Sequence, residues 1–256
     1  MARASETAMG RIAVIVQARY ASTRLPGKVL LDLQGRTVLS RVLERCQAIE
    51  AAHAICCAVS DTPDSDSVAT EAERCGVMVF RGSESDVLAR YYLAARQMEA
   101  EVVLRVTSDC PLLDPEVCSD VLRLRERTGA GYVANNFKPT WPHGLDCEAF
   151  TFTWLERAYQ EAQDPFEREH VCPFIRNHPE TKTANFASPN PDLRRHRWTL
   201  DTPKDWDFMQ AVFARLPEGP ENWGWAAPLA LVEAAPEIWA LNAEEVTPGH
   251  YNEVSS

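Results

Sequence analysis

The chain has 256 residues, of which 45% are hydrophobic and 25% charged, so it can bury a substantial core as one large domain or two small ones. Its 37 acidic residues outnumber 26 basic ones and give a formal net charge of −11, which argues against a general nucleic-acid binder and against a polybasic membrane anchor. No apolar run approaches the ~20 residues that a membrane-spanning helix needs.

Short β-branched strands alternate with longer helical segments along the first half of the chain. Strands are predicted at residues 11–18, 54–59, 77–80, 101–107 and 132–134, and helices at 38–49, 65–75, 86–100 and 115–128. The last of these helices has Asp114 as its N-cap and Pro115 at its first position. Strands separated by helices form parallel βαβ units. The sequence therefore predicts an α/β fold with a doubly wound, mostly parallel sheet.

The pattern loosens after Asn135. Helices are predicted at 153–163 and 165–177, and strands at 183–187 and 197–200. A further helix at 202–216 starts with Thr202 as its cap and Asp205 at its third position. The Pro-rich tail, residues 217–256, contains three tryptophans that we expect to pack back on the domain, namely Trp223, Trp225 and Trp239.

The chain shows no repeat, low-complexity linker or clear boundary, so residues 11–256 are interpreted as a single domain. Residues 1–10 lack the charged start and apolar centre of a secretion signal and are expected to be disordered. The eight cysteines form no C-x-x-C pair and match no zinc spacing. We interpret them as reduced, mostly buried thiols of a cytoplasmic protein.

A cationic loop follows the first predicted strand, and ligands of open α/β sheets bind beyond the carboxyl ends of the strands. This loop, QARYASTRLPGK at residues 17–28, contains Arg19, Arg24 and Lys28 together with Ser22. Such a turn can bind a phosphate group through backbone N–H groups, hydroxyls and cations. It has neither the P-loop spacing nor a G-x-G-x-x-G pattern. From charge alone, a solvated basic turn is an equally good interpretation.

Residues 17–30, QARYASTRLPGKVL, closely resemble the signature of the cytidylyltransferases that make CMP-activated sugars. The CMP-KDO synthetases, which with the acylneuraminate enzymes form the wider group, have Pro in place of Gln17 and Val29. The residues found here are typical of the relatives named after spore-coat polysaccharide biosynthesis. Further segments match that family in order along most of the chain: VFRGSESDVLARYYLAA at 79–95, RVTSDCPLLDPE at 105–116, HGLDCEAF at 143–150, REHVCPFI at 168–175, RWTLDTPKDW at 197–206 and EIWALN at 237–242.

The resemblance implies a nucleotide-diphospho-sugar transferase-like fold and a nucleotidyltransferase reaction that uses CTP and Mg²⁺. CMP would pass from CTP to a small acceptor, whose own oxygen attacks the α-phosphate in line, and pyrophosphate would leave. The chain would then divide into a nucleotide-binding half at 11–135, a half with the acceptor site and second metal ligand at 136–216, and a packed tail at 217–256.

Two aspartates are the candidate metal ligands, because Mg²⁺ binds through carboxylates and phosphate oxygens. Asp109 follows a strand and precedes Pro111, and it has no capping role that would explain it. Asp201 closes the segment RWTL, just before the capping Thr202. In the family, the corresponding aspartates are the metal ligands. Both are expected on the same rim of the sheet as the loop 17–28; a plain turn aspartate is the alternative interpretation of Asp109.

The nucleotide site is expected to combine the loop with the ends of the second and fourth strands. A charged turn is an equally good interpretation of the segment at Ser60, and Arg90 is a weaker candidate because it can pair with an acid on its own helix. The predicted catalytic residues are Arg19, Arg24, Lys28 and Asp109. The predicted nucleotide-binding residues are Gln17, Ala18, Arg19, Ser22, Arg24, Lys28, Ser60, Asp61, Arg105, Thr107 and Asp109.

Two short motifs, HGLDCE and REH, supply the candidate acceptor-binding residues. Their acids and histidines could hydrogen-bond sugar hydroxyls, tune a base or bind an amine, although an ordinary salt-bridged surface is the alternative. An acid-rich pocket suits a purely anionic acceptor poorly unless Arg168 or the cluster at 194–197 offsets the charge. The predicted acceptor-binding residues are His143, Asp146, Glu148, Arg168, Glu169 and His170.

Three functions follow, in order of preference. The first is activation of a small acceptor, an acidic sugar, for cell-surface polysaccharide biosynthesis. The second is CMP transfer to a phosphorylated or phosphonate-bearing metabolite, and the third is a non-catalytic nucleotide-binding partner in polysaccharide assembly. The resemblance also implies a homodimer, and neither nucleic acid nor membrane insertion is expected.

Overall fold

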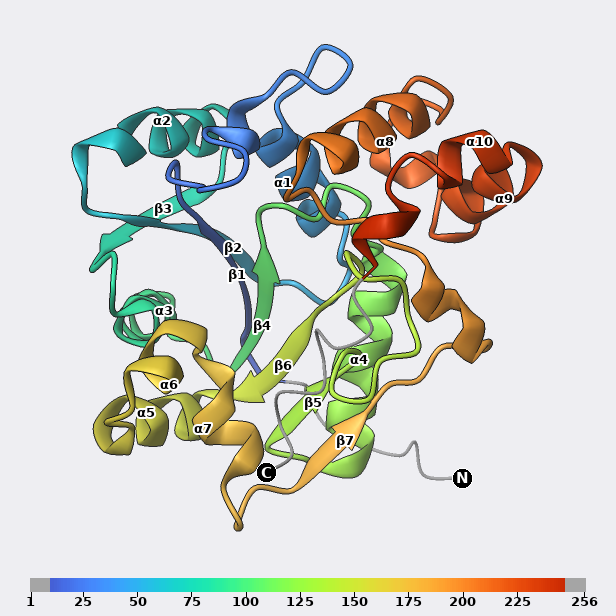
Figure 1. Ribbon diagram of the computed structural model, residues 1–256. Helices are drawn as coiled ribbons and strands as arrows, with labels where there is room; N and C mark the ends of the chain where they lie inside the picture. Colours follow the sequence, from blue (N-terminus) through green and yellow to red (C-terminus); the bar gives the residue numbers. More distant parts are fainter. Residues whose placement is uncertain (1–9, 247–256) are drawn as a thin grey trace, which may run out of the picture.

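The computed structural model describes residues 10–246, in which seven strands form one sheet in the order β3-β2-β1-β4-β6-β5-β7 (Figure 1). The parallel pairs are β1 with β2 and β4, β2 with β3, and β5 with β7, whereas β6 is antiparallel to β4 and β5. The strands are β1 (Ile12–Ala18), β2 (Ala54–Ser60), β3 (Met78–Gly82), β4 (Val102–Thr107), β5 (Tyr132–Ala134), β6 (Glu148–Thr151) and β7 (Thr183–Asn185). The expected α/β fold with a mostly parallel sheet is confirmed.

Helices cover both faces of this sheet, as a doubly wound fold requires. The first helices along the chain are α1 (Val38–Gln47), α2 (Asp66–Arg74), α3 (Val87–Gln97) and α4 (Pro115–Thr128). They are followed by α5 (Phe152–Glu161), α6 (Pro165–His170), α7 (Cys172–Asn177), α8 (Pro203–Phe213), α9 (Ala226–Ala234) and α10 (Pro236–Trp239). Buried side chains of α1, α2 and α4 cluster on one face, and those of α3, α5 and α7 on the other.

Alternation along the central strand shows why the sheet is buried on both faces. In β1, Val14 and Val16 join the cluster with α1, whereas Ala13 and Ile15 join the cluster with α3. Because successive side chains of a strand point to opposite faces, an unbroken apolar run fits a strand covered by helices on both sides. The N-terminal strand was predicted on that basis.

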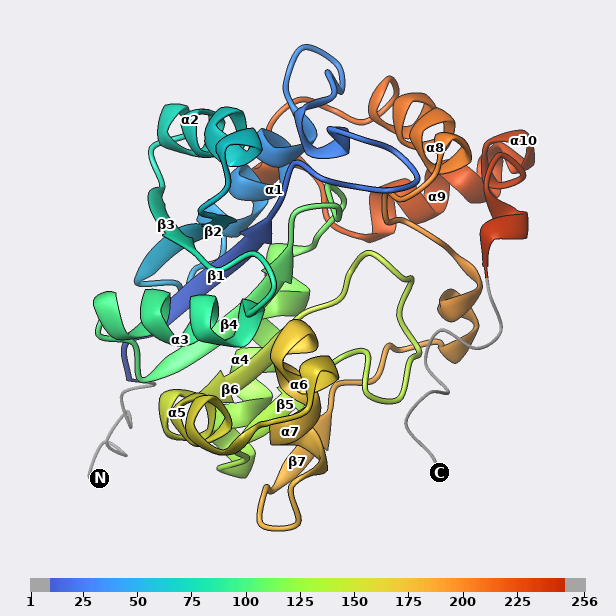
Figure 2. The same cartoon turned by 60° about the vertical axis from the view of Figure 1, so that its left-hand side comes forward.

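A third apolar cluster lies beyond the sheet and joins α8, α9 and α10. In both views these helices lie at the same end of the molecule as the loop after β1 (Figures 1 and 2). Trp223 and Trp225 pack against this cluster as expected. The expectation for Trp239 is wrong, because its residue is 37% exposed while the adjacent Ile238 is buried. Neighbouring positions of a helix point in different directions, and Ile238 takes the inward one.

Four local predictions differ from the structure. Strand β6 was missed because it has only four residues and carries the polar Glu148. Residues 197–200 are not a strand. The N–H of Trp198 donates to the His143 carbonyl and the N–H of Leu200 donates to the Asp109 carbonyl, so their acceptors lie in two different loops.

The helix expected at 165–177 breaks at Val171, whose φ is 68°, because Pro173 cannot continue a helix. The tail helices α9 and α10 were not predicted.

Two further expectations can be compared with residues 10–246. All eight cysteines are free, so the interpretation as thiols is confirmed. No helix in this range is long and apolar enough to cross a membrane. The disordered segment expected at residues 1–10 lies, apart from Gly10, outside the described residues.

Candidate active site

The loop after β1 folds back on itself and delivers a lysine to the rim of the sheet. The Gly27 N–H donates to the Tyr20 carbonyl at 3.1 Å. Gly27 has a φ of 67°, and a Cβ placed there would meet the Tyr20 ring at 3.3 Å, so glycine permits this close turn. The short 3₁₀ helix Lys28–Leu30 starts immediately afterwards.

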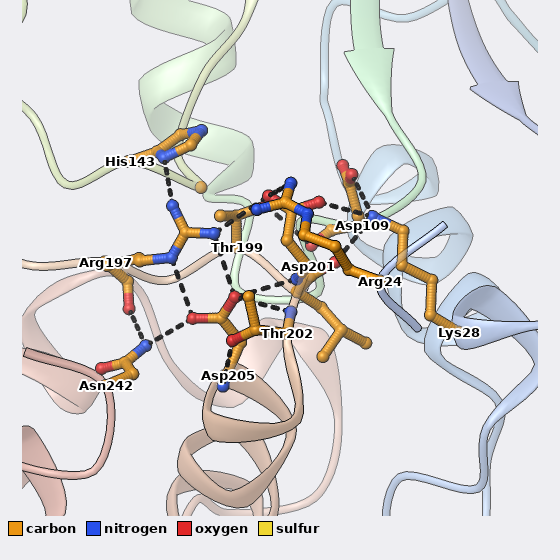
Figure 3. A network of polar contacts seen from close by, with 12 residues as sticks. Arg24, Lys28, Asp109, His143, Arg197, Thr199, Asp201, Thr202, Asp205 and Asn242 are labelled. Carbon is orange, nitrogen blue, oxygen red and sulfur yellow. Dashed lines mark hydrogen bonds and ion pairs between the residues drawn. The ribbon is translucent and has the colours of Figure 1, made fainter. Parts of the chain in front are cut away.

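The ammonium group of Lys28 binds both candidate metal-ligating aspartates (Figure 3). Its Nζ lies 2.8 Å from Asp109 Oδ2, 2.8 Å from Asp201 Oδ1 and 2.7 Å from the Leu200 carbonyl oxygen. The three protons of the ammonium group therefore each have an acceptor. The structure thus brings together the loop, the end of β4 and the start of α8, which the sequence had placed on one rim.

Opposite charges keep this cluster ionised. Burial alone would raise the pKa of Asp109, but the Lys28 ammonium outweighs burial and lowers that pKa to about 2. Burial alone would lower the pKa of Lys28, and the two aspartates outweigh it and raise that pKa. Asp109 and Lys28 are therefore both charged at neutral pH.

Asp201 is held from a second side by arginines. Its Oδ2 lies 3.0 Å from Arg197 Nη2 and 3.4 Å from Arg24 Nη2. Arg197 is buried, whereas the Arg24 side chain is mostly exposed and belongs to the loop. Arg24 therefore has the freedom to bind a ligand that Arg197 lacks.

On the β2 side of the rim, the predicted nucleotide residues have different roles in the fold. Ser60 is buried and its Oγ lies 2.6 Å from the hydroxyls of both Thr62 and Ser65, so it stabilises the turn after β2. The Asp61 N–H donates to the Gly82 carbonyl, and its side chain is exposed. Ser60 therefore shapes the turn, and Asp61 presents a carboxylate beyond it.

Arg90 was a weak nucleotide-binding candidate in the sequence, and the structure makes it a stronger one. It is only 3% exposed, and its Nε and Nη1 have no hydrogen-bond partner among the described residues. Burial lowers the pKa of Arg90, Arg19 lowers it further, and Asp61 raises it, so these side chains share one region. The suggested pairing with an acid on its own helix is wrong for the described structure. Arg90 therefore has two buried N–H groups that a ligand could accept from, because buried donors are usually paired.

Arg105 and Glu148 were expected in different subsites but form one buried ion pair. Arg105 Nη1 contacts Glu148 Oε2, and Arg105 Nη2 donates to Gln17 Oε1 at 3.0 Å. The Tyr132 hydroxyl donates to Glu148 Oε1 at 2.6 Å. Burial would raise the pKa of Glu148, but Arg105 outweighs it and the pKa is lowered. The pair therefore forms a shared wall between the ends of β1, β4 and β6.

His143 and Asp146 lie beside the aspartate–lysine cluster. His143 Nε2 lies 3.8 Å from Asp146 Oδ2, and His143 Nδ1 lies 3.3 Å from Arg197 Nη1. Burial raises the pKa of Asp146, and the like charges of Glu148 and Asp109 raise it further. Asp146 therefore lies within the electrostatic reach of Asp109 and Glu148.

In the described part of the chain, the residues of the REH motif make no hydrogen bond or ion pair with Lys28, Asp109 or Asp201. Arg168 Nη2 lies 2.6 Å from Asp86 Oδ2, and its Nη1 donates to the carbonyl groups of Tyr159 and Ala162. Arg168 therefore ties α6 to the cap of α3. Glu169 and His170 are exposed, and burial lowers the pKa of His170 while Glu169 raises it. Arg105 lowers the pKa of His170 and Glu148 raises it, so His170 lies within the electrostatic reach of this ion pair.

The remaining predicted nucleotide-binding residues lie in the loop after β1 and at the ends of β1 and β4, as expected. Thr107 ends β4, and its hydroxyl lies 3.3 Å from Cys110 Sγ. Ala18 ends β1 and is buried; Ser22 is half-buried and Arg19 is exposed. Within residues 10–246, no group of three or more His, Cys, Asp or Glu side chains could hold a metal ion by itself. A cation at the aspartate pair would therefore need oxygen atoms from a ligand.

Comparisons with known proteins point to one family. Residues 13–210 match the model of a family described as Cytidylyltransferase. The chain is 35% identical over 197 residues (76% of the chain, 80% of the relative) to the uncharacterized protein MJ1063 of Methanocaldococcus jannaschii. It is 30% identical over 219 residues (83% and 90%) to the spore coat polysaccharide biosynthesis protein SpsF of Bacillus subtilis. A cytidylyltransferase structure from Leptospira borgpetersenii aligns with a TM-score of 0.84 at 27% identity, over 90% of this chain and 97% of that one.

Proposed function

Because the chain belongs to the cytidylyltransferase family, we propose that it transfers CMP from CTP to a small hydroxyl-bearing acceptor and releases pyrophosphate in an Mg²⁺-dependent reaction. The family predicted from the loop 17–30 is confirmed, and with it a nucleotidyltransferase enzyme. The observation that carries the finer proposal is the convergence of two carboxylates and Lys28 beside the cationic loop.

The triphosphate of CTP would lie along the loop. Arg19 and Arg24 are exposed there, and Lys28 lies at its end. Cations and backbone N–H groups stabilise phosphate oxygens and the charge that develops on the leaving pyrophosphate. Transfer of a nucleotidyl group needs no covalent intermediate on the protein, so positioning and charge neutralisation are the main contributions of these residues.

Asp109 and Asp201 would hold the magnesium ion. The donor set fits, because both groups are hard carboxylate oxygens that already face the same cation at 2.8 Å. Neither carboxylate is used to cap α8, which is capped by Thr202 and Asp205. When bound, the ion would neutralise phosphate charge and orient the phosphate groups.

Arg90 would recognise the base. Cytosine presents two adjacent acceptors, O2 and N3, on one edge, whereas the N3 of uracil carries a proton. Arg90 has unpartnered N–H groups on Nε and Nη1, which lie on different edges of the guanidinium, so one of them could donate to cytosine N3. This arrangement supports CTP as the substrate and gives a reason for rejecting UTP.

The acceptor would bind beside Asp146 and the Arg105–Glu148 wall. The new bond forms between an acceptor oxygen and the α-phosphorus, and the bond from that phosphorus to the β-phosphate oxygen breaks. The acceptor hydroxyl must lose its proton, and the Asp146 carboxylate, whose pKa is raised by burial, is the proposed base. His143 Nε2, 3.8 Å from Asp146 Oδ2, would orient that carboxylate.

The matched charges of the acceptor half favour a hydroxyl-rich sugar over a phosphorylated acceptor. Arg168 is paired with Asp86, and Arg197 with Asp201 and Asp205. Neither is free to neutralise a dianionic acceptor. We propose an acidic sugar with a single carboxylate, destined for cell-surface polysaccharide, and we retain the homodimer as a prediction.

The test is an assay of pyrophosphate release from CTP and Mg²⁺ with a panel of acidic sugars, neutral sugars and sugar phosphates. We expect release with an acidic sugar and little with the phosphates. Pyrophosphate release only with a phosphorylated or phosphonate-bearing acceptor would overturn the acidic sugar and support CMP transfer to such a metabolite. A protein that binds CTP but turns over with no acceptor would support the non-catalytic partner.

A further inference from the structure

The tail of the chain reaches the site through a buried asparagine. Asn242 is 2% exposed and follows α10, whose Ile238 packs in the third apolar cluster. It precedes the short 3₁₀ helix Ala243–Glu245, yet its side chain makes no cap hydrogen bond there. The Asn242 amide points instead toward Asp205 and Arg197 (Figure 3).

One nitrogen of Asn242 uses both of its protons in this network. Its Nδ2 donates to Asp205 Oδ1 at 3.0 Å and to the Arg197 carbonyl at 2.9 Å. A carboxamide is needed for this pair of bonds, because a carboxylate of the same size has no proton to donate. Asn242 therefore joins the start of α8 to the segment that carries Arg197.

Asp205 does more than cap a helix. It is fully buried, and its Oδ2 accepts hydrogen bonds from the backbone N–H groups of Asp201 and Thr202 at 2.9 and 3.0 Å. Arg197 Nε lies 2.9 Å from Asp205 Oδ1, and Arg197 Nη2 lies 3.0 Å from Asp205 Oδ2. A helix cap needs only the bond to Thr202, so the other bonds fix Asp201 and Arg197 as well.

Arg197 links Asp205 to Asp201, the candidate metal ligand. The same Nη2 atom that binds Asp205 lies 3.0 Å from Asp201 Oδ2, while Asp201 Oδ1 faces Lys28. The backbone and one oxygen of Asp201 are thus both set by groups that Asn242 holds. Residues in the outer layer of metal sites commonly direct a ligating carboxylate in this way.

We propose that Asn242 is a positioning residue that orients the Asp201 carboxylate through Asp205 and Arg197. This inference rests on the proposed function, in which Asp201 holds the divalent cation. The tail would then belong to the reaction site and would not serve only as a cover for the core. A role confined to folding predicts lower stability with unchanged cation binding.

The test measures Mn²⁺ binding to the CTP complex by electron paramagnetic resonance, for the wild type and Asn242→Asp. The substitution keeps the size and removes both donated protons. We expect the Mn²⁺ dissociation constant to rise roughly 10- to 100-fold, and CTP binding in EDTA to stay unchanged. Glu244→Gln is the matched control, because it removes the negative charge of the exposed 2.6 Å ion pair between the same tail segment and Lys204 of α8.

Three outcomes contradict the proposal. Asn242→Asp that binds Mn²⁺ as tightly as the wild type overturns the positioning role alone, and so does an equal loss in Glu244→Gln. A wild type that binds CTP but no Mn²⁺ overturns the metal assignment and this inference with it. If Asn242→Asp does not fold, Asn242→Leu, which keeps the branched shape and removes both donors, carries the same comparison.

Discussion

Lys28, Asp109 and Asp201 were predicted from the sequence chiefly because they stand in motifs that resemble the family's. The acids next to them, Asp114 and Asp205, are consumed by helix starts, whereas Asp109 and Asp201 are not. Two other residues of the site carry no such signal. The partners of Asn242 lie 37 and 45 residues away along the chain. Arg90 is identified by a lack of partners, which only the folded structure reveals.

The first prediction concerns Arg90. Arg90→Met removes two buried donors, and we expect CTP to bind about 1.5–3 kcal/mol more weakly, with most discrimination against UTP lost. The unfolding temperature of the free protein should not fall, because an unpaired buried charge costs free energy. Calorimetric titration with both nucleotides measures the effect. Unchanged selectivity in the variant would remove Arg90 from the base site.

The second prediction concerns Glu148 and pH. The pKa of Glu148 is lowered in the folded protein, so the unfolded chain takes up the proton first as pH falls. The stability that the ionised group contributes is present above its ordinary pKa of 4.5 and is lost as pH falls through the lowered folded value. Glu148→Gln should lower the free energy of unfolding by about 3 kcal/mol near neutral pH, because it breaks a buried pair with Arg105.

Urea unfolding at a series of pH values tests this. The difference between wild type and Glu148→Gln should narrow once the pH drops below 4.5. A difference that stays constant down to the acid limit would show that the charge of Glu148 is not what stabilises the fold.

At the scale of elements, long periodic segments were predicted well and short, tertiary-dependent ones were not. Helices α1, α3 and α4 have caps and apolar faces that are visible in the sequence. Strand β6 pairs with partners far along the chain, and its four residues are too few to show a period. The segment at 197–200 looked like a strand, but its partners lie in two different loops. The bridge between His143 and Arg197, which lies beside the site, is therefore hard to predict from the sequence.

Gly144 tests that bridge. Its φ is 114°, and a Cβ would lie 2.2 Å from the Trp198 carbonyl oxygen, next to the bridge between His143 and Arg197. Gly144→Ala must push these segments apart, so we expect a loss of about 3 kcal/mol or more in stability and a large loss of turnover.

Gly129→Ala is the control for backbone strain. Its φ is 61°, and nothing lies within 4 Å of the position of its Cβ. It should cost only about 1 kcal/mol and leave turnover intact. Thermal denaturation and the pyrophosphate assay distinguish the two variants; equal effects in both would mean that the close approach to Trp198 has no special role.

At the scale of the whole molecule, alternation of strands and helices predicted the doubly wound sheet, while strand order and the antiparallel β6 could not be derived from it. The charges that make up the net charge of −11 are not spread evenly over the chain. The cations Arg19, Arg24 and Lys28 lie in one loop, and two of them, Arg24 and Lys28, pair with the aspartates at the rim of the sheet. The division into nucleotide, acceptor and tail segments remains a prediction, and the Asn242 contacts link the last two.

A thermal-shift screen of the whole protein tests the nucleotide assignment. CTP with Mg²⁺ at about 100 times its dissociation constant should add roughly 2.7 kcal/mol to stability, which corresponds to a rise of roughly 5–10 °C for a chain of this size. UTP, ATP and GTP should give smaller shifts at the same concentration. An equal response to all four would mean that the site binds triphosphates without reading the base.

The central claim is that the aspartate pair and the loop transfer CMP, and single-turnover reactions with CTP labelled at the α-phosphate test it most directly. With Mg²⁺ and an accepted sugar, the wild type should place the label in a CMP–acceptor product. Asp109→Asn and Asp201→Asn should each lower the rate by about 10³-fold, the scale of losing a key electrostatic group. Full transfer by either variant, or label released only as free CMP, would contradict the account.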